Sequence, residues 1–238
     1  MRGTLGPLWL AWLAAAGAAG GCSMFDQVGS GSLSFKLLAP DFHIDSTDPR
    51  WWPSPPSGVP EVVCSGPAAL VSNCCQPPPP MFAVNCQAYP LSCDDSHMCA
   101  LVFDYDYAVE IDLGNDVPDL QQQRDRVLTQ ATLASFDTTV EVADAGTLPL
   151  RAASLWAAPQ GAKSDRAAGA VFLAGIPLTS GISHVDLAAD AQDALSAFLM
   201  DFNTPFALIL SGHVVIESAP VPNTALTINV AGQVNASF

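Results

Sequence analysis

Two short stretches combine residue types that could carry out hydrolysis. Asp104 and Asp106 are two positions apart in a segment with strand-like alternation, so their Cα atoms should lie roughly 6.5–7 Å apart on one face. Such a pair could serve as acid and base in a cleft, but the solvated face of an antiparallel sheet carries the same residues. Ser183, His184 and Asp186 are the types of a catalytic triad, yet strand alternation turns Ser183 away from His184. We therefore expect no catalytic residue and no enzymatic activity.

Oxygen-bearing side chains also gather around a glycine turn. Asp112, Asn115, Asp116 and Asp119 flank Gly114, and hard oxygen ligands in a loop suit Ca²⁺. The spacing is not that of an EF-hand, and helix capping by Asp116 would explain the same residues. We expect no cofactor, and we keep calcium as the alternative.

Six of the seven cysteines fall in one segment that is also rich in proline. This segment is too short to bury a core of its own, and disulfides are the expected substitute. Adjacent cysteines bond to different partners, but the sequence does not choose among the pairings that six cysteines allow. A zinc site with His97 is disfavoured because the segment contains no Cys-x-x-Cys pair. The predicted disulfide residues are Cys64, Cys74, Cys75, Cys86, Cys93 and Cys99.

The N-terminus has the features of an export signal that ends at a lipidated cysteine. Arg2 precedes an apolar stretch at 8–16, which is shorter than the roughly 20 residues of a membrane-spanning helix. The sequence at 19–22, Ala-Gly-Gly-Cys, then resembles the lipobox of bacterial lipoproteins, although Leu is usual at its first position. We predict cleavage before Cys22 and acylation of Cys22. The alternative is cleavage after Ala18, which leaves Cys22 as a plain thiol.

Acylation of Cys22 would also leave an even number of cysteines for pairing, as an exported chain needs. Residues 1–21 are thus predicted to be a signal peptide and 22–31 a small, polar tether. Ser23 stands where lipoproteins kept at the inner membrane carry Asp. By this resemblance the protein belongs at the outer membrane, on either its periplasmic or its surface face.

The chain of 238 residues is strongly acidic, with 8 Lys and Arg against 23 Asp and Glu and a net charge of −15. Such a surface repels nucleic-acid phosphates, so we exclude nucleic acid as a partner. We expect contact with the membrane through the lipid anchor, and with an envelope protein or a glycan.

Apolar and polar residues alternate with period two over most of the remaining chain, which predicts strands. The clearest is 101–113, and 206–217 is apolar on both faces, as in a central strand. The alternation changes parity near Ala134-Ser135, which predicts a bulge. The one convincing helix is 191–202, with Asp190 as its N-cap. Further strands are expected at 33–37, 42–44, 127–142, 148–156, 171–178, 182–187 and 226–238, and a helical turn at 118–124.

These elements predict a mainly β fold, an antiparallel β-sandwich with one amphipathic helix. The sandwich would span residues 32–238 as a single domain, with a proline-rich and disulfide-rich insertion at about 49–99. The layout is similar to that of uncharacterised exported lipoproteins of Gram-negative bacteria, the myxobacterial kind especially. In these a Cys/Pro-rich segment precedes an all-β domain, and the ending resembles residues 220–230 here. The resemblance implies no activity.

The function that we expect is that of a lipid-anchored envelope protein whose non-catalytic sandwich has a structural or interaction role. The first alternative is a ligand-binding module for a glycan, a lipid or calcium. The second is an exported hydrolase, which would require His184 or the Asp104 and Asp106 pair to lie in a real cleft.

Overall fold

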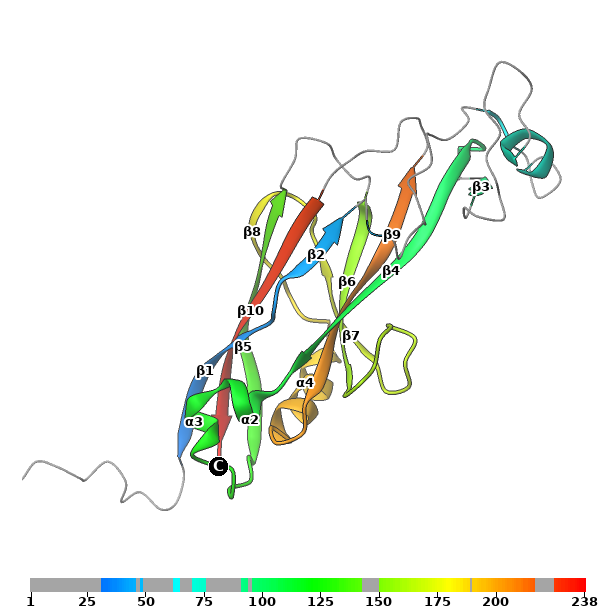
Figure 1. The fold of residues 1–238 in the computed structure, drawn as a ribbon. Coiled ribbons are helices and arrows are strands. Elements are labelled where there is room, and N and C mark those ends of the chain that lie inside the picture. Colours follow the sequence, from blue (N-terminus) through cyan, green and yellow to red (C-terminus); the bar gives the residue numbers. More distant parts are fainter. Residues whose placement is uncertain are drawn as a thin grey trace, which may run out of the picture. The chain divides into compact units, whose positions relative to one another are not determined.

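The computed structural model describes residues 31–45, 48, 62–64, 70–75, 91–93, 96–142, 150–188, 190–216 and 225–238. Residues 32–238 form one compact unit, and its strands make two antiparallel sheets (Figure 1). The first, here called the β10 sheet, has the order β1-β10-β5-β8, and β2 also pairs with β10. Its strands are β1 (Ser32–Leu38), β2 (Phe42–Asp45), β5 (Gln130–Val142), β8 (Gly181–His184) and β10 (Ala225–Ser237).

The second sheet, here called the β9 sheet, has the order β3-β4-β9-β6-β7. Its middle strand is the one whose two faces are both apolar, and residues 206–211 of that strand are all buried. This confirms the predicted central position. The strands are β3 (Leu91–Cys93), β4 (Cys99–Ile111), β6 (Leu150–Pro159), β7 (Val171–Ile176) and β9 (Phe206–Ile216).

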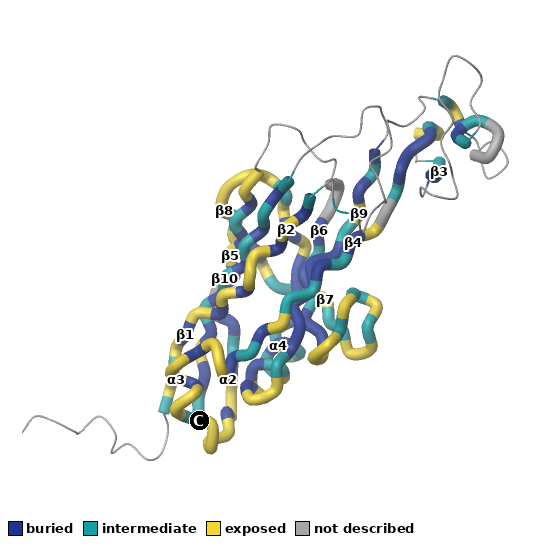
Figure 2. The backbone as a smooth tube through the Cα atoms, viewed as in Figure 1, coloured by how far each residue is buried: buried dark blue, intermediate teal, exposed yellow. Residues whose placement is uncertain are grey.

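The two sheets pack face to face, so the predicted β-sandwich is confirmed. Alternate apolar residues of both sheets form one core, in which Ile228 and Val234 of β10 and Leu155 and Leu210 of the β9 sheet are 0% exposed. Figure 2 shows buried positions along β9, whereas much of α2 and α3 is exposed. Full burial of one such side chain stabilises the fold by about 1.5–3 kcal/mol.

The described helices are short: η1 (Leu70–Cys75), which is a π-helical turn, α2 (Leu113–Asp116), α3 (Pro118–Gln121) and α4 (Ala191–Met200). The predicted amphipathic helix is α4, which buries Leu195 and Leu199 and contacts β5 and β7. Asp190 lies at its N-cap position, but its side chain makes no capping hydrogen bond. No helix within the described ranges is long and apolar enough to cross a membrane.

The strand predicted at 101–113 ends two residues early, so that prediction was wrong at its C-terminal end. The Asp112 side chain caps α2 by accepting the backbone N–H of Asn115 at 3.1 Å, and Leu113 begins this helix. A Cβ atom at Gly114 would lie 3.0 Å from the carbonyl oxygen of Phe202. The cap begins a helical turn where the predicted strand would have continued, and the close approach leaves no room for a side chain at position 114.

β5 contains the bulge that the change of parity predicted. Leu133 pairs with Val234 of β10, but Ser135 pairs with Gln233, so the register shifts at this point. The extra residue lets Leu133 and Phe136, which have opposite parity, both lie in the core.

Candidate functional site

Polar side chains meet on the outer face of the β9 sheet because the strand register places them side by side. Asp104 of β4 pairs with His213 of β9, and Asp106 pairs with Ser211. Ser211 is in turn opposite Ser154 of β6. Since side chains alternate along a strand, this row faces away from the core between the sheets.

The loop between β6 and β7 covers one side of the same face. Beneath it lies a small apolar cluster that is separate from the main core and that includes the fully buried Ile209, with Trp156 packed against it. Ala162 of the loop packs on this cluster. As a result Asp165 and Arg166, which follow in the loop, stand beside the polar row.

These residues line a pocket of about 260 Å³. Its ionisable groups are three carboxylates, one guanidinium and one imidazole. Arg166 Nη2 lies 2.9 Å from Asp104 Oδ2, and His213 Nδ1 contacts Asp104 Oδ1. Asp106 Oδ1 accepts the backbone N–H of Asp165 at 3.5 Å. The two basic groups therefore hold Asp104, while Asp106 and Asp165 supply the remaining negative charge.

Ser211 is a polar side chain buried at the base of this pocket. It is 5% exposed, and no hydrogen bond to its hydroxyl is made within the described part of the chain. Trp156 Nε1 is likewise buried without a partner there, and its ring meets Phe172 edge to face with centroids 5.3 Å apart. The buried side-chain atoms without a partner in the described ranges are Thr138 Oγ1 and Trp156 Nε1, so the Ser211 hydroxyl stays accessible from the pocket, where a ligand can pair with it.

Burial raises the pKa of the Asp106 carboxyl above its ordinary value. The neighbouring carboxylates of Asp165 and Asp104 act in the same direction, whereas the Asp165 N–H and Arg166 lower this pKa. Because the folded-state pKa is the higher one, the folded protein binds this proton more tightly than the unfolded chain does. The contribution of Asp106 to stability is therefore present below the unfolded pKa and is lost as the pH rises through the folded pKa.

Asp106→Asn should thus stabilise the protein near pH 7 and lose this advantage at low pH. We expect a gain of about 1 kcal/mol or less, because the site is partly exposed and screened. Thermal unfolding of both proteins from pH 3 to pH 8 measures the effect. Glu110→Gln, which removes one charge from an exposed position of the same strand, is the matched control. A gain that persists unchanged at the lowest pH would contradict the assignment.

Of the residues considered from the sequence, Asp104 and Asp106 lie in this pocket. Ser154, Ser211 and His213 were not predicted to join them, because the pairing of strands far apart in the chain cannot be read from residue types. One signal was present: Ser211 and His213 interrupt an otherwise apolar strand.

Ser183, His184 and Asp186 lie in a different place, at the end of β8 and just beyond it. His184 Nδ1 is 3.0 Å from Asp137 Oδ1 of β5, and His184 Nε2 is 4.0 Å from Asp186 Oδ1. The side chains of His184, Asp137 and Asp186 are all at least half exposed. The imidazole therefore contacts two carboxylates at the surface, and polar contacts between exposed side chains contribute little to stability.

The calcium candidates lie in and beside α2 and α3. Asp112 accepts the backbone N–H of Asn115 at 3.1 Å and its side-chain N–H at 2.5 Å, and Asp116 Oδ2 accepts the backbone N–H of Asp112 at 3.2 Å. Arg124 donates to the side-chain oxygen of Asn115. Asp119 is exposed in the first turn of α3. Capping and the Arg124 contact thus engage oxygen atoms that a calcium ion would need.

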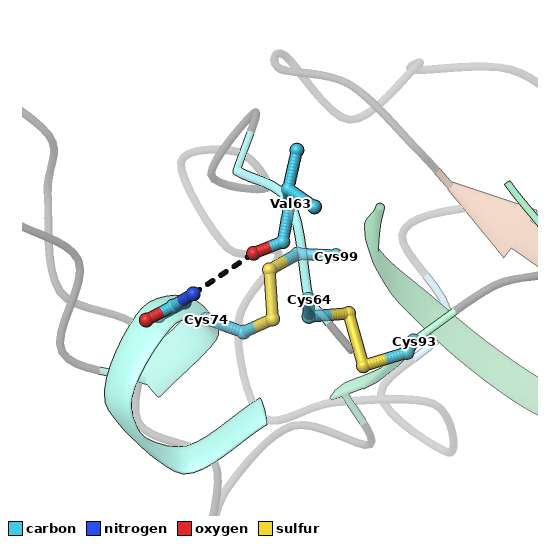
Figure 3. Close-up of a disulfide and its surroundings, with 6 residues drawn as sticks. Val63, Cys64, Cys74, Cys93 and Cys99 are labelled. Atoms are coloured by element: carbon cyan, nitrogen blue, oxygen red, sulfur yellow. Dashed lines mark hydrogen bonds between the residues drawn. A yellow bond between two sulfur atoms is a disulfide. The ribbon is translucent and has the colours of Figure 1, made fainter. Parts of the chain in front are cut away.

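Two disulfides link the segments of the insertion, Cys64–Cys93 and Cys74–Cys99 (Figure 3). Cys75 is also disulfide-bonded, so the adjacent Cys74 and Cys75 have different partners, as predicted. Asn73 of η1 donates to the carbonyl oxygen of Val63 at 2.9 Å and ties the same segments together. The predicted disulfide-bearing insertion is therefore present.

The insertion also contains a cluster of sulfur atoms. The Sγ atoms of Cys64, Cys74 and Cys99 lie within 4.8 Å of one another, but each belongs to a disulfide and is not free to bind a metal. Cys86 and the predicted lipidation site Cys22 lie outside the described residues, as do the signal peptide and most of the tether.

Fold and site together define the protein as an antiparallel β-sandwich with a carboxylate-lined surface pocket. No family model and no curated protein matches the chain. Among solved structures, a chain of Desmodium yellow mottle tymovirus is similar at 14% identity, over 67% of this chain and 91% of that chain, with a TM-score of 0.23. A TM-score this low supports no conclusion about function.

Proposed function

We propose that this is a lipid-anchored protein of the cell envelope whose β-sandwich binds a partner rather than catalysing a reaction. The observation that carries the proposal is the buried disulfide pair of the insertion, in which Cys64, Cys74 and Cys99 are 0% exposed. Disulfides form and persist in oxidising compartments outside the cytosol, which is where a lipoprotein signal would deliver the chain.

The N-terminal sequence supplies the rest of this proposal. Cys22 follows a short apolar segment in a context that resembles a lipobox, and Ser23 favours the outer membrane over the inner one. The likeness to exported lipoproteins of the myxobacterial kind supports the same location. The acidic pocket on the β9 sheet is the surface that we assign to the partner.

The mass of the intact protein extracted from membranes tests the anchor. We expect a chain that begins at Cys22 and carries acyl groups. Cys22→Ser should lose both the acyl groups and the attachment to the membrane, whereas the neighbouring control Ser23→Ala should keep both. An unmodified N-terminus upstream or downstream of Cys22 in the wild type would refute the proposal.

A second function, an exported hydrolase, is favoured by one observation in the pocket. The Nδ1 atom of His213 pairs with Asp104, as the histidine of a hydrolytic triad pairs with its aspartate, and the hydroxyls of Ser154 and Ser211 line the same pocket. A fluorophosphonate probe, which labels activated serines, separates the two functions. We expect no labelling, and covalent labelling of Ser154 or Ser211 would establish the hydrolase.

A further inference from the structure

We propose that the pocket on the β9 sheet binds an ammonium or guanidinium group. This inference rests on the binding role proposed above and names the class of ligand. Asp104, Asp106 and Asp165 contribute three carboxylates to a pocket in which Arg166 and His213 are the basic groups. The carboxylates remain in excess even when His213 is protonated, so the pocket attracts a cation and repels an anion.

Several side chains that line the pocket accept hydrogen bonds, which suits the same class of ligand. The Asp106 carboxylate only accepts, and the hydroxyls of Ser154 and Ser211 can accept as well. Ser211 is 5% exposed and has no hydrogen-bond partner among the described residues. Ammonium and guanidinium groups carry donors only, and their hydrogen bonds to carboxylates are strong because both partners are charged.

Arg166 of the chain itself shows that these carboxylates accept a guanidinium. Its Nη2 atom lies 2.9 Å from Asp104 Oδ2, and its Nε atom lies 4.0 Å from Asp165 Oδ1. The Arg166 side chain is 79% exposed, so a ligand can displace it from the mouth of the pocket at little cost. Trp156 lines the pocket as well.

The size of the pocket and its arrangement of charges argue against other ligands. Its volume of about 260 Å³ is below the roughly 300–1,000 Å³ of drug-sized sites, so it suits one basic side chain or a small amine. Ca²⁺ takes roughly 6–8 oxygen ligands. Arg166 and His213 already engage both carboxylate oxygens of Asp104, which leaves fewer oxygen atoms than such a coordination shell needs.

Titration calorimetry on the full-length mature protein in detergent tests the proposal. The probe is Nα-acetyl-arginine amide, and its control is Nα-acetyl-citrulline amide, which has nearly the same shape but no charge. We expect the arginine compound to bind at least about tenfold more tightly than the citrulline compound. Asp106→Asn should weaken binding of the arginine compound by about tenfold, and Ser211→Ala should weaken it severalfold. Glu110→Gln, outside the pocket on the same strand, should leave it unchanged.

Equal binding of the two compounds, or no binding of the arginine compound to the wild type, would overturn the proposal. So would an Asp106→Asn variant that melts at or above the wild-type temperature and binds as tightly as the wild type. Tighter binding of N-acetyl-Gly-Arg-Gly amide than of ethylguanidinium would favour a side chain of a protein partner as the ligand, and the reverse would favour a small free cation. If Cys22 is acylated but the arginine compound does not bind, the inference about the ligand is wrong and the proposed envelope location is unaffected.

Discussion

Replacing both Cys74 and Cys99 by alanine should lower the free energy of unfolding by about 2–5 kcal/mol. The disulfide between them joins η1 to the start of β4 across 25 residues of sequence, and both cysteines are 0% exposed. Without the bond the unfolded chain gains conformational freedom, and the insertion has little core of its own to resist it. Urea unfolding of the double variant and the wild type measures the loss.

The second disulfide provides a matched comparison. Cys64–Cys93 closes a loop of similar length, with a separation of 29 residues, so chain entropy alone predicts nearly the same loss for its double alanine variant. A difference between the two variants therefore measures the packing around each bond. A loss below about 1 kcal/mol for both would show that the insertion does not depend on its disulfides.

Phe206→Ala should destabilise the sandwich by about 3–5 kcal/mol. Phe206 begins the central strand β9, is 1% exposed and stacks on Phe198 of α4, with ring centroids 5.6 Å apart and an interplanar angle of 28°. Its removal would open a cavity where the helix meets the sheet. Thermal and urea unfolding should both report the loss, with the native strand content retained in circular dichroism at low temperature.

Phe172→Ala is the control for this prediction. Phe172 of β7 is 37% exposed and makes an edge-to-face contact with Trp156. Loss of that contact should cost about 0.5–1.5 kcal/mol, less than the loss of a fully buried ring, because more than a third of the surface of Phe172 is already exposed. If Phe206→Ala and Phe172→Ala lower the free energy of unfolding by the same amount, the assignment of Phe206 to the core would be contradicted.

The sequence by itself determined most of the sandwich, because its strands are long and have one buried face. The period-two alternation of β4 and β10 requires one face in a core, and the first half of β9, which is apolar on both faces, requires a neighbour on each side. The change of parity at Ala134-Ser135 required a bulge, since otherwise Leu133 and Phe136 could not both be buried. The spacing of Leu195 and Leu199 in the same way required a helix with one apolar face.

Only the tertiary structure decided which polar residues share a site. Asp104 and His213 are more than a hundred positions apart, and the register of β4 on β9, which pairs them, depends on contacts that no local pattern encodes. Arg166 reaches Asp104 because the β6–β7 loop packs on the apolar cluster around Ile209. Local periodicity determines which face of a strand is buried. Which side chains lie next to one another on the exposed face depends on strand pairing and packing across the whole domain.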